Sequence, residues 1–136
     1  DAAMPGLSAA LGGRTRLMMS IPVRPAGTSM SLQSKELARN YQDFAGALIL
    51  DTCPDPSATR NFGCTGRTND WEICAEIVAN SNCPVILAGG LDPGNVASSI
   101  NAVRPFGVDA CTSLEMSDKS KNLAACQQFV RAVREG

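Results

Sequence analysis

Two adjacent glycines separate a short apolar run from a helix start in residues 85–96, which read V-I-L-A-G-G-L-D-P-G-N-V. The first four residues are apolar without alternation, which is typical of a strand covered by protein on both faces. Gly89 and Gly90 allow the backbone to approach another group closely. Asp92 and Pro93 are favoured at the first positions of a helix, where main-chain N–H groups bind anions. The segment therefore predicts a phosphate site, and the alternative is a tight turn with only a structural role.

A carboxylate, Asp51, follows a second short apolar run at residues 47–50. This order predicts a carboxylate at the carboxyl end of a buried strand. The chain contains no histidine, which excludes Ser-His-Asp and Cys-His catalysis and leaves a carboxylate as the expected general acid. The alternative is an aspartate that only accepts hydrogen bonds from loop N–H groups.

Alternating strand and helix patterns must position these groups. The predicted strands are residues 16–23, 47–50, 85–88 and 107–111, and the predicted helices are residues 31–44, 70–80, 93–103 and 122–134. Residues 1–15 form a leader without an assigned element, although the first 13 could hold a helix. This order predicts an α/β fold of parallel βα units in a single domain over residues 1–136.

Composition excludes several classes of protein. The chain is 44% hydrophobic and 18% charged with a net charge of −1, which fits a compact globular protein and predicts no binding of nucleic acid. No stretch is long and apolar enough to span a membrane, and the printed residues contain no apolar region typical of a signal peptide, although the sequence begins without Met and leaves a processed upstream part open. The six cysteines form no C-x-x-C pair, so no metal site is predicted. Buried cysteines in a reducing compartment, the cytoplasm or an organellar matrix or stroma, are expected rather than secretion.

Four strings of the sequence carry a family resemblance. They read L-I-L-D-T, G-C-T-G-R-T-N-D-W, V-I-L-A-G-G-L-D-P-G-N-V and V-R-P-F-G-V-D-A-C-T-S-L-E. They resemble, in order, L-L-D, G-G-T-G-K-T-F-D-W, L-A-G-G-L-N-P-E-N-V and R-P-x-x-V-D-V-S-S-G-V-E of the carboxyl-terminal half of phosphoribosylanthranilate isomerases. The family fold is a (βα)8 TIM barrel of roughly 200 residues or more. The resemblance therefore implies that 136 residues form about four of the eight units, a half-barrel without the amino-terminal half.

The resemblance also implies a chemistry without a cofactor, the opening of a ribose ring in an Amadori-type rearrangement of tryptophan biosynthesis. Asp51 matches the general acid that protonates the furanose oxygen. The family's base is a cysteine at the end of the first strand, so none of the six cysteines here matches it. The implied phosphate loops contain Gly89, Gly90, Thr112 and Ser113. The implied mobile sixth loop contains Gly63, Thr65, Gly66 and Arg67.

Several departures from the family pattern lie on the catalytic face. Cys64 replaces a glycine, Arg67 replaces a lysine, and Ser113 stands where the family has glycine. A serine with positive φ would cost on the order of 1 kcal/mol. These losses favour a degenerate, non-catalytic half-barrel that serves as a structural or binding subunit of a larger assembly.

Two alternatives to that main hypothesis remain. The first is the carboxyl-terminal part of an active isomerase completed by a missing amino-terminal half, and the second is a homodimeric half-barrel acting on another sugar phosphate. Each hypothesis predicts a partner, another protein chain or a second copy, that covers the open sheet edges.

Overall fold

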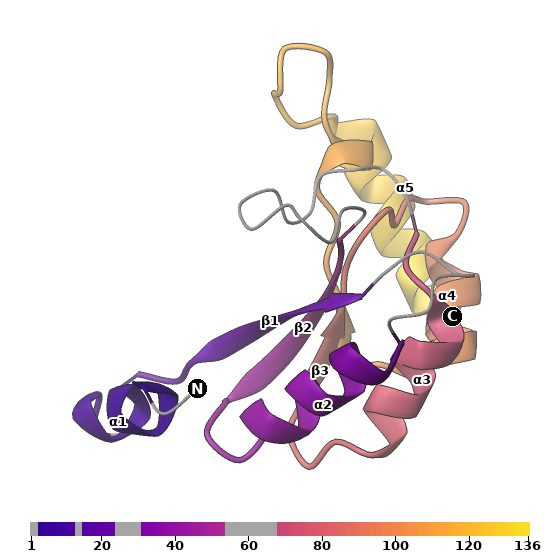
Figure 1. The fold of residues 1–136 in the computed structure, drawn as a ribbon. Coiled ribbons are helices and arrows are strands. Elements are labelled where there is room, and N and C mark those ends of the chain that lie inside the picture. The colour runs from indigo at the N-terminus through magenta and orange to yellow at the C-terminus, as the bar shows by residue number, and fades with distance from the viewer. Residues whose placement is uncertain (1–2, 13–14, 24–30, 54–67) are drawn as a thin grey trace.

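A four-stranded parallel sheet forms the centre of the computed structural model, which describes residues 3–12, 15–23, 31–53 and 68–136 (Figure 1). The strands lie in chain order, β1 (Met18–Val23), β2 (Ala47–Thr52), β3 (Val85–Leu87) and β4 (Gly107–Val108). The helices are α1 (Ala3–Ala10), α2 (Ser31–Tyr41), α3 (Trp71–Ala79), α4 (Val96–Val103), the 3₁₀ helix η1 (Thr112–Leu114) and α5 (Leu123–Glu135). The predicted α/β fold of four parallel βα units is therefore confirmed.

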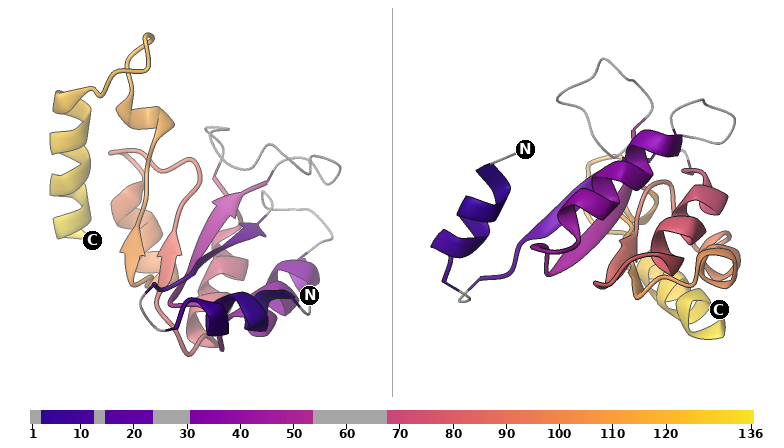
Figure 2. Two further views of the ribbon diagram at one scale, coloured as in Figure 1. Left: turned by 90° about the vertical axis from the view of Figure 1, so that its left-hand side faces the viewer. Right: turned by 60° about the horizontal axis from the view of Figure 1, so that its bottom comes forward.

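The helices cover one face of the sheet. α2, α3 and α4 lie on the same side of the strands, and α5 lies beside α4, in both views of Figure 2. The core between these layers contains fully buried strand residues such as Ile21, Leu48, Leu50 and Leu87. Helix α1 extends beyond the amino end of β1, away from this core (Figure 1).

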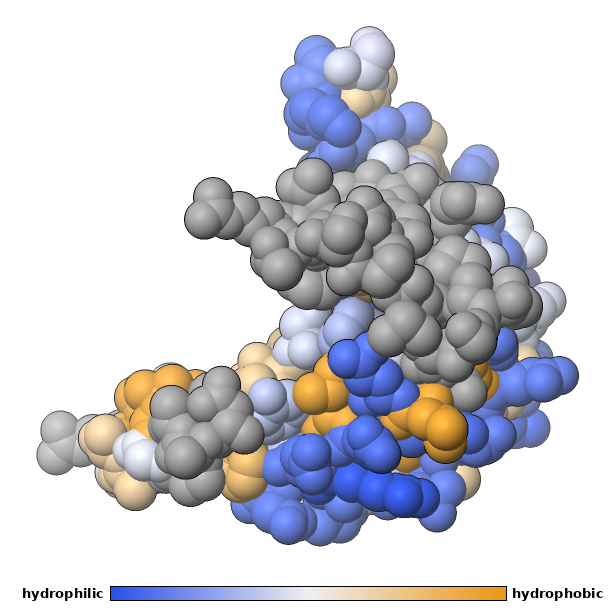
Figure 3. All heavy atoms as spheres, in the orientation of Figure 1, coloured by the Kyte–Doolittle hydropathy of each residue, from blue (hydrophilic) through white to orange (hydrophobic). Residues whose placement is uncertain are grey.

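The other face of the sheet carries no helix from the described part of the chain. Along β2, Leu48 and Leu50 are fully buried, whereas the alternate residues Ile49 and Asp51 are only half-buried. On β1, Met18 is 55% exposed. Figure 3 shows a hollow on this side, above the residues of α1. The strands are thus apolar on both faces, as predicted, but only one face is packed within these residues.

Most element boundaries differ from the predicted ones by a few residues, as is usual where hydrogen bonds rather than side-chain patterns end an element. The strand predicted over residues 107–111 is shorter, since only Gly107–Val108 pair with β3 as a strand. The helix predicted over residues 31–44 ends at Tyr41. The first 13 residues do hold a helix, α1.

The predicted start of one helix at Pro93 is wrong. Residues 93–95 form a turn and α4 begins at Val96. The reason is the side chain of Asp92, whose Oδ1 accepts hydrogen bonds from the N–H groups of Gly94 and Asn95 at 2.7 and 2.9 Å. Asp92 therefore caps the turn that precedes the helix.

None of the helices in the part of the chain that the structure describes is long and apolar enough to cross a membrane.

Candidate active site

Asp51 is the penultimate residue of β2 and lies on the half-buried, helix-free face of the sheet. Its Oδ1 accepts a hydrogen bond from the N–H of Thr52 at 2.8 Å. Burial raises the pKa of the Asp51 carboxyl, the N–H of Thr52 lowers it, and the negative charge of Asp109 raises it. The net effect is a pKa above the ordinary value, which favours a carboxyl that keeps a proton at higher pH.

Asp109 is a second carboxylate at this edge, and the sequence analysis missed it. It directly follows β4, and its N–H donates to the Leu87 carbonyl at 2.8 Å, which continues the strand pairing by one residue. Val108 packs against the core, so the side chain of Asp109 alternates to the same face as Asp51. The V-D pair at the end of a predicted strand was the available signal, because L-D marks Asp51 in the same way.

Gly89 and Gly90 form a left-handed turn directly after β3, with φ angles of +86° and +63°. A Cβ atom on Gly89 would lie 2.1 Å from Thr52 Oγ1 and 2.8 Å from the Thr52 nitrogen. Gly89 is therefore required by its backbone conformation and by the close approach of β2, independently of any ligand.

The N–H groups that follow this turn are used within it. Asn95 donates from Nδ2 to the Gly90 carbonyl at 2.9 Å and accepts the N–H of Asp92 on Oδ1 at 2.9 Å. The N–H of Val96 donates to the Asp92 carbonyl at 3.1 Å. The prediction that free N–H groups at the helix start face a ligand is therefore wrong for Asp92, Asn95 and Val96. The main-chain N–H groups of these residues donate to side-chain or carbonyl oxygens within the turn.

Thr112 and Ser113 lie in η1, beside the Gly-Gly turn rather than in an extended loop. The Ser113 hydroxyl donates to the Leu91 carbonyl and so connects the segment after β4 with the turn after β3. Among the described residues, the non-glycine residues with positive φ are Arg104 and Lys119. The expected strain at Ser113 is therefore wrong, since a serine in a right-handed 3₁₀ helix needs no left-handed conformation.

Asn69, another residue that the sequence analysis missed, is only 4% exposed. Its Nδ2 donates to the Ala88 carbonyl at 3.1 Å and to the Leu50 carbonyl at 3.4 Å. The next residue, Asp70, is the N-cap of α3 and accepts the N–H groups of Glu72 and Ile73. The N-D pair gave a signal for the helix start, but nothing in it indicated a buried amide between two strands.

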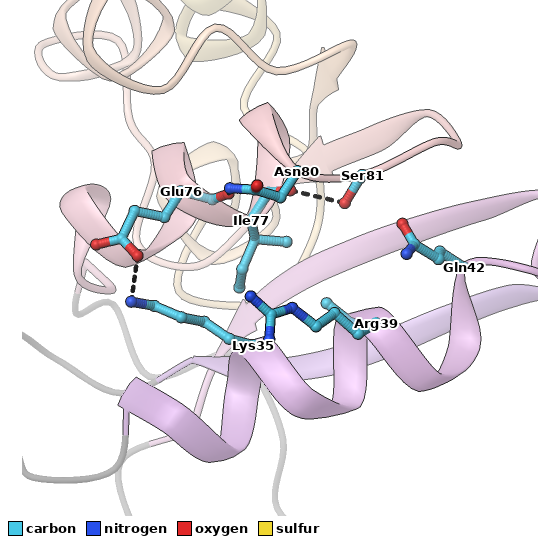
Figure 4. A pocket seen from close by; sticks show the side chains of 8 residues that line it. Lys35, Arg39, Gln42, Glu76, Ile77, Asn80 and Ser81 are labelled. Atoms are coloured by element: carbon cyan, nitrogen blue, oxygen red, sulfur yellow. Dashed lines mark hydrogen bonds and ion pairs between the residues drawn. The ribbon is translucent and has the colours of Figure 1, made fainter.

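The remaining candidate residues and pockets add no further groups to this site. Gly63, Thr65, Gly66 and Arg67 lie outside the described residues. In the described ranges no three His, Cys, Asp or Glu side chains come together as a possible metal site. A small groove lies between α2 and α3 on the outer helical layer, where Lys35 and Glu76 form an ion pair (Figure 4). It lies in the helical layer, whereas Asp51 is on the helix-free face of the sheet.

The parallel sheet, its one-sided helical layer and the polar groups at its carboxyl edge define a protein of the TIM-barrel-like α/β class. The family model described as N-(5'phosphoribosyl)anthranilate (PRA) isomerase matches residues 14–132. The chain belongs to this family. The resemblance noted from the four strings of sequence is thereby confirmed.

Relatives of the same name are similar over a part of their length. The N-(5'-phosphoribosyl)anthranilate isomerase of Methanocella arvoryzae is 42% identical over 99 residues, which are 73% of this chain and 44% of that protein. The isomerase of Haloferax volcanii is 39% identical over 97 residues, 71% of this chain and 42% of that protein. The matched segments thus span less than half the length of these relatives.

Solved structures give the same result for the fold. The N-(5'-phosphoribosyl)anthranilate isomerase of Pyrococcus furiosus matches with a TM-score of 0.72 and 22% identity, over 98% of this chain and 59% of that one. The phosphoribosyl anthranilate isomerase of Thermotoga maritima matches with a TM-score of 0.72 and 25% identity, over 96% of this chain and 57% of that one. Four βα units of this chain therefore superpose on a part of a longer fold.

Proposed function

We propose that this chain is the carboxyl-terminal half of a phosphoribosylanthranilate isomerase that is active when an amino-terminal half completes the barrel. The observation that carries the proposal is the placement of Asp51 at the carboxyl edge of the sheet with a raised pKa. Active sites of TIM barrels lie at this edge. The names of the relatives, at up to 42% identity, support the same activity.

In this proposal Asp51 is the general acid. A carboxylic acid must be protonated to donate to the furanose oxygen, and burial together with the charge of Asp109 favours that state. The acceptor of the substrate proton is the cysteine that the family has on its first strand, which belongs to the half that completes the barrel. Asp51 and this cysteine would then act from the two halves of one site.

The substrate phosphate would bind between the Gly89-Gly90 turn and the segment of Thr112 and Ser113. The Ser113 hydroxyl connects these two segments through the Leu91 carbonyl, which supports a common site for their main-chain N–H groups. Because the N–H groups of the following turn are engaged internally, the anion would depend on the glycine turn itself rather than on the start of α4.

The competing hypothesis is a degenerate subunit without activity. The main argument for it was the loss of glycines on the catalytic face. Ser113, which stands at one of these glycine positions, lies in a 3₁₀ helix without positive φ, so its side chain causes no backbone strain. The replacement of glycine by Cys64 still favours it. We favour the active half-barrel, the alternative of the sequence analysis, because the family model and the similar relatives are isomerases and because Asp51 and the Gly89-Gly90 turn both lie at the carboxyl edge of the sheet.

The partner would cover the helix-free face of the sheet. Half-buried Ile49 and Ile86 and exposed Met18 lie on this face, and β1 and β4 are its two edge strands. An amino-terminal half-barrel would pair with both edges at once, whereas a second copy would give a homodimer. The isomerase of Thermotoga maritima is itself described as dimeric.

A reducing compartment remains the proposed location, in keeping with the free thiols of Cys74, Cys83 and Cys126.

A reconstitution experiment tests the function. The chain is co-expressed with the amino-terminal half of the Methanocella arvoryzae isomerase, and the fluorescence of phosphoribosylanthranilate is followed with the purified complex. The expected result is turnover by the complex, none by either half alone, and none with Asp51→Asn. A stable complex without turnover would instead support the degenerate subunit.

A further inference from the structure

A buried amide lies between the carboxyl ends of β2 and β3. Asn69 is 4% exposed, and its Nδ2 is 3.1 Å from the Ala88 oxygen and 3.4 Å from the Leu50 oxygen. An NH₂ group carries two hydrogens, so one side chain can donate to both carbonyls. Asn69 thereby bridges two neighbouring strands at the edge where the candidate site lies.

The two carbonyls belong to the peptide groups that precede the proposed functional residues. The Leu50 carbonyl is bonded to the nitrogen of Asp51, and the Ala88 carbonyl is bonded to the nitrogen of Gly89. The N–H of Ala88 also donates to the Leu50 carbonyl at 2.8 Å. The orientation of both peptide planes is therefore coupled to the same amide.

Stability alone does not explain an asparagine at this position, because the two hydrogen bonds that it donates come together with a buried oxygen that accepts none from the described residues. Its Oδ1 is buried and has no hydrogen-bond donor among the described residues, and a buried acceptor without a donor opposes folding. Capping of α3 does not explain it either, because Asp70 is the cap. An apolar residue would avoid the unpaired Oδ1 but would not donate to the Ala88 carbonyl, and the family motif that this string resembles has phenylalanine here.

We propose that Asn69 is a positioning residue that fixes the orientation of Asp51 relative to the Gly89-Gly90 turn. The inference rests on the proposed function, in which the carboxyl acts at one end of the substrate and the glycine turn holds the phosphate at the other. Because the two strand ends are separate, their relative placement decides whether the bound ring oxygen meets the carboxyl. Misplacement of a reacting group by about 1 Å can lower a rate by about 100-fold.

The kinetic test compares Asn69→Leu with Asn101→Leu in the reconstituted complex. Asn101 also donates from Nδ2 to a main-chain oxygen, that of Ala97 at 3.1 Å, but it is exposed on α4. We expect Asn69→Leu to lower kcat by about 10- to 100-fold with little change in KM, in a complex that still assembles. Asn101→Leu is expected to leave kcat unchanged. A wild-type kcat in Asn69→Leu would overturn the inference.

A measurement on the chain alone separates this inference from the proposed function. In Asn69→Leu, and in Asn69→Ser as a second variant that is too short to reach both carbonyls, the amide NMR signals of Asp51 and Gly89 should shift together. The titration midpoint of the Asp51 carboxyl, followed by carbon NMR, should move as well, whereas Asn101→Leu should change neither. Unshifted Asp51 and Gly89 signals in a folded variant would overturn the positioning role even if the complex proves inactive. Shifted signals together with an inactive wild-type complex would support the positioning role and count against the proposed function.

Discussion

Asp51 and Asp109 lie at the same level of the sheet, on opposite sides of β3. The register pairs Leu50 with Leu87 and Leu87 with Val108, so the next residue on β2 and on β4 is an aspartate. Two strand spacings separate them, roughly 10 Å. At this distance the charge of Asp109 acts on Asp51 without a direct contact, and it contributes to the raised pKa of Asp51.

Asp109→Asn is expected to lower the pKa of the Asp51 carboxyl, because the negative charge that disfavours ionisation is removed. A carbon NMR titration of Asp51 measures this change. The control is Asp118→Asn, which removes an exposed carboxylate after η1. If Asp51 is the general acid, the pH at which the reconstituted activity declines on the alkaline side should move downward with the same variant.

Asp51→Asn is expected to abolish turnover and to raise the stability of the chain at neutral pH. Because the folded-state pKa of Asp51 is raised, protonation stabilises the fold at low pH, and this contribution is lost as the pH rises through the folded-state pKa. The neutral amide avoids that loss. The gain in melting temperature should therefore be present at pH 7 and vanish below the ordinary value of 3.8. A variant less stable than the wild type at pH 7 would contradict this reasoning.

Gly89→Ala is expected to destabilise the chain by about 2 kcal/mol or more. The added Cβ would meet Thr52 at its side-chain oxygen and its nitrogen, and φ is +86°. Gly107→Ala is the matched control, because a Cβ there meets nothing within 4 Å. Urea unfolding of both variants measures the difference, and equal losses would show that the turn tolerates a side chain.

Ser113→Ala should cost about 1 kcal/mol of stability, since the hydrogen bond to the Leu91 carbonyl is lost. It should also weaken the binding of inorganic phosphate to the chain, measured by amide NMR shifts at Gly89 and Gly90. Ser117→Ala, at an exposed position after η1, is the control. Unchanged phosphate shifts would separate Ser113 from the proposed phosphate site.

Met18→Asp should weaken association with the amino-terminal half by at least about tenfold, because the contact would bury an unpaired charge. Met18 is 55% exposed on the helix-free side of the sheet. Leu32→Asp is the matched control, since Leu32 is 70% exposed on α2, in the helical layer. Sedimentation of the mixed halves measures the difference, and equal affinities would place the interface elsewhere.

The sequence by itself determined the parts of this protein that depend on local patterns. Apolar runs and helical spacing predicted the four strands and the helices between them, because burial selects these periods residue by residue. The strings around Asp51 and Gly89-Gly90 were sufficient to indicate the family. The glycines were identifiable since a left-handed turn excludes other side chains locally.

Only the tertiary structure decided which groups from separate elements meet. Asn69 is buried between two strands, Asp109 lies opposite Asp51 across β3, and the Ser113 hydroxyl reaches the Leu91 carbonyl. Each relationship joins residues that are distant in sequence, so its distance depends on strand register and helix packing rather than on local preference. The backbone conformation of Ser113 also depended on the tertiary structure. The family motif has glycine at this position, which predicted strain for a serine. Its conformation was set instead by the 3₁₀ helix that begins after Cys111.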